Sequence, residues 1–248
     1  MFVNERFEQI LDYLKKYKKA SITDLAKLFY VSESTIRRDI DEMNNMGLLA
    51  RYHGGAIYLE KSDEVSIYVR MEKNTKEKEL AASIALHHLP PFKTIFIDNS
   101  STCLSLAQRL DLTNKTVITN SLQVALKLST KKDVEILLPG GIIKFNTNAI
   151  SGSLAIRQLS SYNIDVTICS CAAIDENGAY ESSLDTTQLK KTALENSKQK
   201  ILIVDDKKFS YKATYLLEHL HNFDYIITNA DDKTIEPFKA KSLKIYNS

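Results

Sequence analysis

Residues 32–40 carry the side chains in this chain that are best suited to recognising DNA. Two adjacent arginines, Arg37 and Arg38, follow the small hydroxyl-bearing residues Ser32, Ser34 and Thr35. An arginine fork can bind a phosphate, or it can donate two hydrogen bonds to the O6 and N7 atoms of guanine in a major groove. These five residues are therefore candidate DNA-binding side chains of a recognition helix.

The same segment has the periodicity of a helix that packs on one face. Ser32 can cap the helix by accepting a hydrogen bond from an early backbone N–H. Ile36, Ile40 and Met43 recur at i, i+4 and i+7 and define a buried stripe. Arg38 then points away from that stripe, which leaves its guanidinium available to a partner molecule.

An ordinary solvated helix is the alternative for this segment. Arg37 could pair with Asp41, and Arg38 with Glu42, both at i, i+4. The surrounding elements decide between these interpretations.

Two helices are expected before the recognition helix. The first begins at a candidate cap, Asn4, and carries an apolar stripe made by Phe7, Ile10, Leu11 and Leu14. The second begins near another candidate cap, Thr23, and carries Leu25, Leu28 and Phe29. A turn over residues 30–33 then leads into the recognition helix, which is the pattern of a helix-turn-helix.

A β-hairpin is expected after the recognition helix. Gly47 suits a helix C-cap, and two short apolar runs flank Gly54 and Gly55. Such a hairpin would form a wing, with Arg51 and His53 placed to contact phosphate or a minor groove. For His53, a solvent-facing turn residue is an equally good interpretation.

Charge does not by itself favour DNA binding. Basic and acidic side chains balance over residues 1–60, and the whole chain of 248 residues has a formal net charge of +2. DNA affinity therefore requires that charges segregate onto one face, and it favours two copies of the domain on a two-fold site.

The composition indicates a protein of two domains in a reducing compartment. At 44% hydrophobic residues, the chain can fill a small domain and a larger one. Three cysteines without framework spacing, no signal segment and no long apolar run favour a cytoplasmic protein without a membrane span. We expect a winged helix-turn-helix over residues 1–57, a polar linker over 58–77 and an α/β domain over 78–248.

In the second domain, short β-rich runs alternate with helical stretches. The expected strands are 94–98, 116–120, 134–139, 165–174, 201–205, 225–228 and 243–246. The expected helices include 102–110, 122–128, 153–160 and 185–195. This alternation predicts a Rossmann-like α/β fold, in which a mostly parallel sheet is covered on both faces.

Polar residues lie at or just beyond the carboxyl ends of five expected strands: Asp98, Asn120, Gly140 with Gly141, Asp175 and Asp205. Ligands bind at this edge of open α/β sheets. Turn chemistry alone would also place Asp, Asn and Gly at strand ends. The coincidence of five such positions favours a ligand site.

An anionic ligand would suit this edge. Ser100, Ser101 and Thr102 lie where a strand turns into a helix, whose first N–H groups can bind a phosphate. Plain N-capping is the alternative, because capping needs only one of the hydroxyls. Lys208 could supply a cation, and Gly140 could let the backbone approach a ligand closely.

Several motifs at fixed, long spacing resemble the DeoR family of bacterial repressors. In the first domain these are Arg6-x3-Ile10-x3-Leu14, Ser32-x2-Thr35-Ile36-Arg37-Arg38-Asp39-Ile40 and Arg51-Tyr52-His53-Gly54-Gly55-Ala56. In the second they are Lys78-x2-Ala81-Ala82, Asp98-x-Ser100-Ser101-Thr102, Thr119-Asn120-Ser121, Gly140-Gly141, Ile174-Asp175-x2-Asn177-Gly178 and Asp205-x2-Lys208-Phe209. The resemblance covers nearly the whole chain, with departures such as Lys191 where arginine is usual.

The resemblance implies a sensor domain similar in fold to ribose-5-phosphate isomerase and glucosamine-6-phosphate deaminase. It implies a homodimer or homotetramer that binds double-stranded operator DNA and is released by a phosphorylated sugar. By position, Ser100, Ser101 and Thr102 would hold the phosphate. The residues nearer the sugar or the phosphate rim would be Asp98, Asn120, Asp175 and Lys208. No cofactor and no metal are implied.

Two other classes of function compete with a regulator. A sugar-phosphate isomerase-like enzyme could use a carboxylate base at the same edge, although an enzyme gains nothing from a helix-turn-helix. A redox or metal sensor could use Cys169 and Cys171, which would share one face of a strand. Zinc sites need two further ligands, which the sequence does not offer, so buried free thiols are the expected state.

Overall fold

A computed structural model describes residues 3–45, 48–58, 67–239 and 243–247. The chain divides into two compact units, Met1–Lys73 and Asn74–Ser248. Each unit has its own hydrophobic core, so each is considered separately below.

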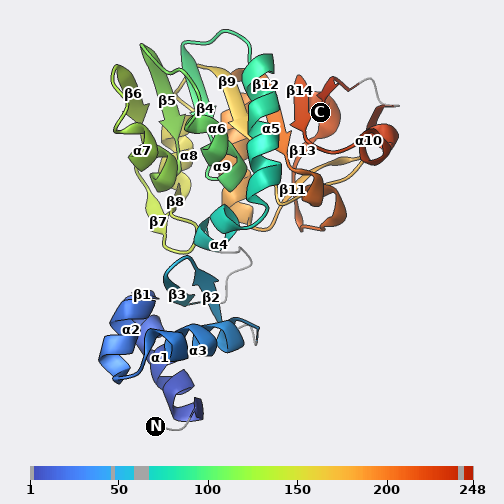
Figure 1. The fold of residues 1–248 in the computed structure, drawn as a ribbon. Helices are drawn as coiled ribbons and strands as arrows, with labels where there is room; N and C mark the ends of the chain where they lie inside the picture. The colour runs from blue at the N-terminus through green and yellow to red at the C-terminus, as the bar shows by residue number, and fades with distance from the viewer. Residues whose placement is uncertain (1–2, 46–47, 59–66, 240–242, 248) are drawn as a thin grey trace. The chain divides into compact units, whose positions relative to one another are not determined.

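The first unit is a winged helix-turn-helix (Figure 1). Its helices are α1 (Val3–Tyr17), α2 (Ile22–Phe29), α3 (Glu33–Asn45) and α4 (Ile67–Glu72), and its strands are β1 (Lys19–Ser21), β2 (Leu49–Tyr52) and β3 (Gly55–Tyr58). The predicted hairpin is present as β2 and β3. Strand β1 was not predicted; it pairs with β3 to make a three-stranded antiparallel sheet.

Close packing explains why strand β3 of the wing begins with glycine. A Cβ atom on Gly55 would lie 2.2 Å from the carbonyl oxygen of Ala20. Strand β1 can therefore pair with β3 only because this position has no side chain.

The apolar stripes predicted for α1 and α3 form the core of this unit. Phe7, Ile10 and Leu14 of α1 pack in one buried cluster with α3 residues, which include Ile36 and Met43. Burying each of these side chains contributes about 1.5–3 kcal/mol relative to leaving it in water. The predicted helical periodicity is confirmed.

A buried ion pair fixes α1 against α3. The Nη2 atom of Arg6 lies 2.8 Å from Oδ1 of Asp39, and Nε of Arg6 bonds the other carboxylate oxygen. Both side chains are almost completely buried. Since a buried charge is tolerated only with its partner, this pair sets how the recognition helix is held on the domain.

The helix starts differ from prediction at two positions. Ser21, not Thr23, caps α2 by accepting a hydrogen bond from the N–H of Asp24. Asn4 lies inside α1 and does not precede it. The C-cap predicted at Gly47 falls outside the described residues.

The second unit is built on a seven-stranded sheet whose strand pairs are all parallel. The strand order is β15-β14-β12-β9-β4-β5-β6. The strands are β4 (Thr94–Ile97), β5 (Lys115–Thr119), β6 (Val134–Leu137), β9 (Ile164–Cys169), β12 (Ser197–Val204), β14 (Tyr225–Thr228) and β15 (Ile245–Tyr246). The predicted Rossmann-like α/β architecture is confirmed.

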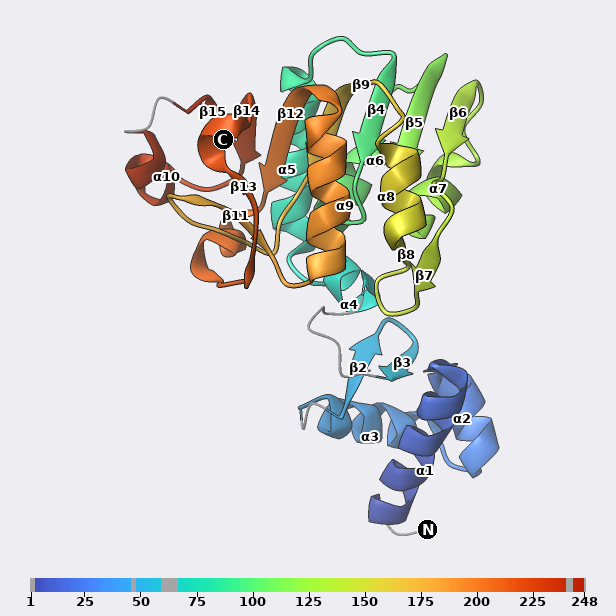
Figure 2. The ribbon, with the colours of Figure 1, turned by 180° about the vertical axis from the view of Figure 1, so that it is seen from behind.

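Helices cover both faces of this sheet. On one face lie α5 (Thr75–His88), α6 (Ser101–Ala107) and α7 (Leu122–Leu128), which pack in sequence (Figure 1). On the other lie α8 (Ser153–Leu159) and α9 (Leu184–Glu195) (Figure 2). Helix α10 (Asp232–Lys239) lies near β14 and β15.

Two small sheets lie beside the parallel sheet and were not predicted. A hairpin forms from β7 (Ile142–Lys144) and β8 (Ala149–Ser151). An antiparallel sheet of order β10-β11-β13 forms from Ala173–Ile174, Gly178–Glu181 and Tyr215–His219. Two 3-10 helices, η1 (Asp206–Ser210) and η2 (Leu220–Asn222), complete the unit.

The strand predicted over residues 165–174 is in fact two strands in different sheets. Strand β9 ends at Cys169, and β10 begins at Ala173. Between them, the N–H and C=O groups of Ser170 are bonded to buried charged side chains. Those bonds take the place of ladder bonds, so the strand breaks there.

The range 58–77, assigned to a linker from the sequence, holds α4 and the first residues of α5. Among the described residues, no helix is both long enough and apolar enough to cross a membrane.

Candidate functional site

The amino end of α3 presents a network of hydroxyls. Ser32 Oγ accepts a hydrogen bond from the N–H of Thr35 at 3.2 Å, which confirms the predicted cap. The same atom lies 2.8 Å from the hydroxyl oxygens of both Ser34 and Thr35. Ser32 and Ser34 are exposed, so this network can exchange its internal bonds for bonds to phosphate oxygens.

The two arginines of α3 are in different states. Arg37 Nη2 lies 3.0 Å from Glu33 Oε2, one turn earlier in the helix. Hydrogen bonds from Thr23 and Arg37 hold the pKa of Glu33 below its usual value. The pairing with Asp41 considered from the sequence is therefore absent from α3. Arg38 is exposed and has no carboxylate partner within the described part of the chain.

The wing is tied to α3 through Arg51. The guanidinium of Arg51 pairs with Asp41, and its backbone N–H donates to Asn44 Oδ1 at 3.0 Å. His53 lies exposed in the turn of the hairpin, where its backbone N–H bonds the carboxylate of Glu72 in α4. The basic residues predicted for the wing thus lie on the surface, with Arg51 already engaged by a carboxylate.

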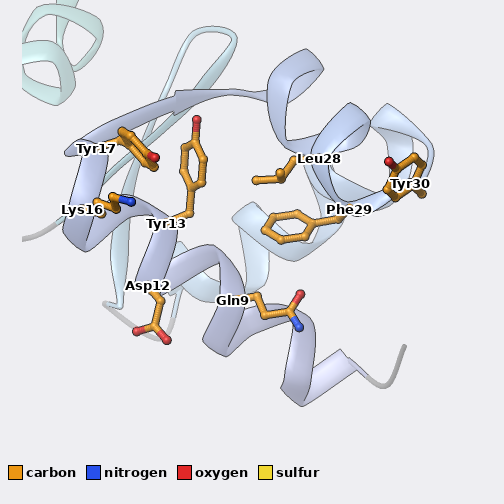
Figure 3. Close-up of a pocket in the computed structure, with 8 residues that line it drawn as sticks. All are labelled: Gln9, Asp12, Tyr13, Lys16, Tyr17, Leu28, Phe29 and Tyr30. Atoms are coloured by element: carbon orange, nitrogen blue, oxygen red, sulfur yellow. The ribbon is translucent and has the colours of Figure 1, made fainter.

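An open hollow of about 560 Å³ lies between α1 and the end of α2 (Figure 3). Tyr13, Tyr17 and Phe29 line it together with Leu28, which is 47% exposed. Leu28, expected on the buried stripe of α2, therefore belongs to this surface, and Ala26 takes its place in the core.

In the second unit, Asp98 directly follows β4 and is completely buried. Its Oδ1 atom accepts hydrogen bonds from the N–H of Ser100 at 2.9 Å and from the Ser100 hydroxyl at 2.6 Å. Its Oδ2 atom accepts one from the N–H of Ser170 at 3.0 Å and pairs with the ammonium of Lys190. Both carboxylate oxygens are therefore fully committed to the protein.

Lys190, on α9, is the centre of this buried charge cluster. Its ammonium also donates to Glu181 Oε1 at 2.7 Å and to the carbonyl oxygen of Ser170 at 3.0 Å. Burial opposes the charged form, but Asp98 and Glu181 outweigh burial and raise the pKa of Lys190. Burial also opposes the charged form of Asp98, which by itself would raise the pKa of Asp98. The ammonium of Lys190 outweighs burial and lowers that pKa.

The loop after Asp98 is the predicted phosphate cradle. Ser100 caps α6 by accepting a hydrogen bond from the N–H of Cys103 at 3.1 Å. Ser101 and Thr102 are buried in the first turn of α6. Among the described residues, their backbone N–H groups have no hydrogen-bond acceptor, as is usual at a helix start. One hydroxyl is thus used for capping, and two remain beside unpaired donors.

The next strand ends in a similar way. Asn120 follows β5, and its amide nitrogen donates weakly to the carbonyl of Ile150 at 3.4 Å, while its Oδ1 atom is buried without a donor. Ser121 caps α7 through the N–H of Val124. Because β4 and β5 are parallel neighbours, Asp98 and Asn120 lie along one edge.

The glycine pair after β6 serves local packing. The N–H of Gly140 donates to Gln158 Oε1 at 2.6 Å. A Cβ atom on Gly141 would lie 2.6 Å from the carbonyl of Ser151. The close approach that Gly141 makes is therefore to strand β8, and the approach of this pair to a ligand stays a prediction.

Asp175 does not follow a strand of the parallel sheet. It lies in the exposed turn between β10 and β11, where Oδ1 accepts hydrogen bonds from the N–H groups of Asn177 and Gly178 at 2.8 and 3.0 Å. The expectation that it shares the strand edge with Asp98 is wrong, because residues 165–174 break into two strands. Turn chemistry accounts for this aspartate.

Asp205 and Lys208 lie at the carboxyl end of β12. Asp205 is completely buried, and neither of its carboxylate oxygens has a hydrogen-bond partner among the described residues. Lys208 is half-buried in η1, and its N–H bonds the carbonyl of Asp205 at 3.0 Å. Since β12, β9, β4 and β5 are successive neighbours, these residues complete the row begun by Asp98 and Asn120.

Sequence analysis missed the residues that neutralise this edge. Lys190 and Glu181 are buried beside Asp98, and Ser170 links them. A signal existed for Lys190, because it shares a helical face with Thr187 and Leu194, both in the buried side of α9.

The three cysteines are free thiols buried in the second unit. Cys169 ends β9 and Cys171 lies beyond it, so they do not share one face of a strand as predicted. Burial raises the pKa of Cys171 to about 12, and it raises that of Cys103 and Cys169 as well. Thiols in this state are poor nucleophiles.

Comparison with known proteins gives matches along most of the chain. Residues 6–62 match the family model of the DeoR-like helix-turn-helix domain, and residues 73–230 match that of the DeoR C terminal sensor domain.

Relatives are similar over nearly their full length. The uncharacterized HTH-type transcriptional regulator YulB of Bacillus subtilis (strain 168) is 31% identical over 246 residues, which cover 98% of this chain and 94% of that protein. The glycerol-3-phosphate regulon repressor of Escherichia coli (strain K12) is 31% identical over 228 residues, which cover 91% of this chain and 90% of that protein.

Among solved structures, ribose 5-phosphate isomerase A from Methanocaldococcus jannaschii aligns with a TM-score of 0.40 at 14% identity, covering 55% of each chain.

The buried cluster leads to a stability prediction. Lys190→Met should lower the free energy of unfolding by about 3–5 kcal/mol, because it leaves the Asp98 and Glu181 carboxylates buried without a cation. Urea denaturation of the full chain, followed by circular dichroism, would measure this. Lys191→Met is the matched control, since Lys191 makes no ion pair among the described residues. Equal midpoints for the two variants would contradict the assignment.

Proposed function

The chain belongs to the DeoR family of helix-turn-helix transcriptional regulators, and we propose that it represses a sugar or sugar-derivative operon until a phosphorylated sugar releases it from its operator. The protein is a DNA-binding regulator with a sensor domain. The proposal adds that the protein represses transcription, that its effector is a phosphorylated sugar, and which residues bind DNA and effector.

The unpaired guanidinium of Arg38 on α3 is the observation that best supports the DNA contacts. We assign base recognition to Arg38, since an exposed arginine without an internal partner can enter a major groove at little cost. Arg37 and Arg51 must first leave Glu33 and Asp41, so we assign them to phosphates, which offer stronger charge. Ser32, Ser34 and Thr35 would also bind phosphate, and His53 would contact the minor groove or backbone.

The effector would bind at the carboxyl edge of the parallel sheet. Ser101 and Thr102 would hold the phosphate with their hydroxyls and unpaired N–H groups, and Lys208 would supply a positive charge. Asn120 would bind the sugar. Asp98 and Ser100 are already hydrogen-bonded to each other, so we propose that they position this loop. The name of the E. coli relative includes a phosphorylated polyol, which supports this class of effector.

We propose that the site binds sugar phosphate without converting it. Of the three carboxylates considered as bases, Asp98 is neutralised by Lys190 and Asp175 caps its own turn. An isomerase needs a base and an acid placed on both sides of the reacting carbons. The carboxylate that is left, Asp205, lies near the ammonium groups of Lys208 and Lys78, and conversion there is disfavoured because an isomerase gains nothing from a helix-turn-helix.

Two-fold recognition would require a homo-oligomer. The first unit offers one short recognition helix, and a dimer places two such helices on successive major grooves. Sugar phosphate binding would then favour an arrangement of the dimer or tetramer that cannot bind both half-sites, which requires different effector affinities in the two arrangements.

A DNA-binding titration would test the function as a whole. Fluorescence anisotropy with DNA flanking the protein's own coding region would be measured at fixed, near-physiological salt. Each of a panel of sugar phosphates would be compared with its unphosphorylated parent. We expect specific binding that a phosphorylated compound weakens and its parent does not. Release by a parent sugar, or no binding to DNA, would contradict the proposal.

In the same titration, Arg38→Ala should weaken specific binding by about 1–3 kcal/mol, the usual cost of losing a base contact. Arg37→Ala should cost less, because its guanidinium gives up an internal ion pair on binding. Lys132→Ala, which removes one exposed, unpaired charge from the second unit, is the control for net charge. Equal losses in Arg38→Ala and Lys132→Ala would show that Arg38 acts only through charge.

For the effector, Ser101→Ala and Thr102→Ala should each raise the concentration of sugar phosphate that releases DNA by about tenfold or more. Each removes a hydroxyl that would bond an anionic phosphate, and DNA affinity without effector should not change. Ser105→Ala, one turn further along α6, is the control. An unaltered dose-response in both variants would mean that the loop is only a helix cap.

A further inference from the structure

Asp205 stands apart from the other buried carboxylates of the second unit. Asp98 and Glu181 share the ammonium of Lys190, whereas neither oxygen of Asp205 has a hydrogen bond of normal geometry among the described residues, and the backbone N–H of Lys207 is near enough to lower its pKa. Its side chain is nevertheless completely buried. A buried acceptor without a donor is costly, so a native protein keeps one only where something else supplies the donor.

Asp205 belongs to a row of such acceptors. Asn99, Asn120 and Ser170 are also buried, and each has a side-chain oxygen without a partner within the described part of the chain. Asn120, Ser170 and Asp205 directly follow β5, β9 and β12, and Asn99 is the second residue after β4. These four strands are parallel neighbours, so all four side chains lie at one edge of the sheet.

Little in the described part of the protein donates hydrogen bonds to these acceptors. The amide nitrogen of Asn120 already bonds the Ile150 carbonyl, and Lys190 is consumed by its own cluster. Burial raises the pKa of Asp205, against the opposing effects of Lys208 and Lys78. The carboxylate is therefore held in an environment that neither lysine fully compensates.

We propose that Asp205 is a specificity-determining residue that accepts hydrogen bonds from the hydroxyls of the effector and rejects effectors that carry a carboxylate at that position. This inference rests on the proposed function and narrows the ligand to a neutral, hydroxyl-rich carbon chain with one phosphate. A second anion beside Asp205 would be repelled at short range in a buried site.

The distance between β4 and β12 agrees with a phosphate bound at one strand end and hydroxyls bound at the other. Strand β12 lies two strands from β4, which corresponds to about 10 Å at the usual spacing of neighbouring strands. A phosphate held at the Ser101–Thr102 loop would thus be separated from Asp205 by the length of a carbon chain. Asn120 and Ser170 would accept hydroxyl donors along the way.

Direct binding of matched probes tests the proposal. Ribitol 5-phosphate would be compared with 5-phosphoribonate, and glucitol 6-phosphate with 6-phosphogluconate, by calorimetric titration of the full chain. In each pair a terminal hydroxymethyl group is replaced by a carboxylate. We expect the wild type to bind the polyol phosphate of at least one pair about tenfold or more tighter than its acid.

Asp205→Asn should bring that ratio close to one, because the amide neither repels the acid nor accepts hydroxyls as strongly. Asp206→Asn is the matched control: it removes the same charge one residue away, from a side chain paired with Lys207, and should keep the wild-type ratio. An unchanged ratio in Asp205→Asn, or the same change in both variants, would overturn the proposal.

The thermal stability of the ligand-free protein gives a second, independent test. Asp205→Asn should raise the melting temperature by about 2–4 °C, because it removes a buried charge whose burial outweighs the effects of Lys208 and Lys78, without changing shape. A lower melting temperature would show that Asp205 already has a partner, and would overturn the proposal. If the wild type bound none of the four probes, the proposed polyol class would be wrong, whereas release from DNA by another sugar phosphate would keep the proposed function.

Discussion

The proposed ligand edge of the second unit depends on one buried ammonium. Lys190 joins Asp98, at the end of β4, to Glu181 in β11 and to the backbone of Ser170 after β9. Taking these charges out of water is costly, and only their close mutual contact offsets that cost. The cluster therefore fixes the ends of two parallel strands and the end of β11 in one arrangement, and the loops that would hold the effector extend from the ends of the parallel strands.

The first unit uses a buried pair in the same way. Arg6 and Asp39 hold α3 on α1, while Arg37 and Arg38 of the same helix are exposed. The buried pair positions an element. Of the exposed arginines of this unit, Arg37 and Arg51 are paired with carboxylates, and Arg38 has no carboxylate partner among the described residues.

The periodicity of the sequence predicted the features that depend on local spacing along the chain. The stripes of α1 and α3, the cap at Ser32 and the order of parallel strands follow from local spacing. Pairing between distant residues does not have such a signal. Neither the break at Ser170 nor the misplaced Asp175 could be predicted, since both result from Lys190 capturing the backbone after β9. A strand prediction cannot include a charge that arrives from a helix twenty residues later.

Asp98 and Asp205 show that the position of a residue in the sheet does not determine its hydrogen bonds or the direction of its pKa shift. Both directly follow a buried parallel strand, and both are completely buried. Asp98 is bonded on both oxygens and has a lowered pKa, whereas Asp205 has no hydrogen bond of normal geometry on either oxygen within the described ranges and has a raised pKa. From the sequence alone the two are equivalent strand-end aspartates. The difference arises because α9 brings the ammonium of Lys190 into direct contact with Asp98, whereas Lys208 and Lys78 act on Asp205 without outweighing its burial.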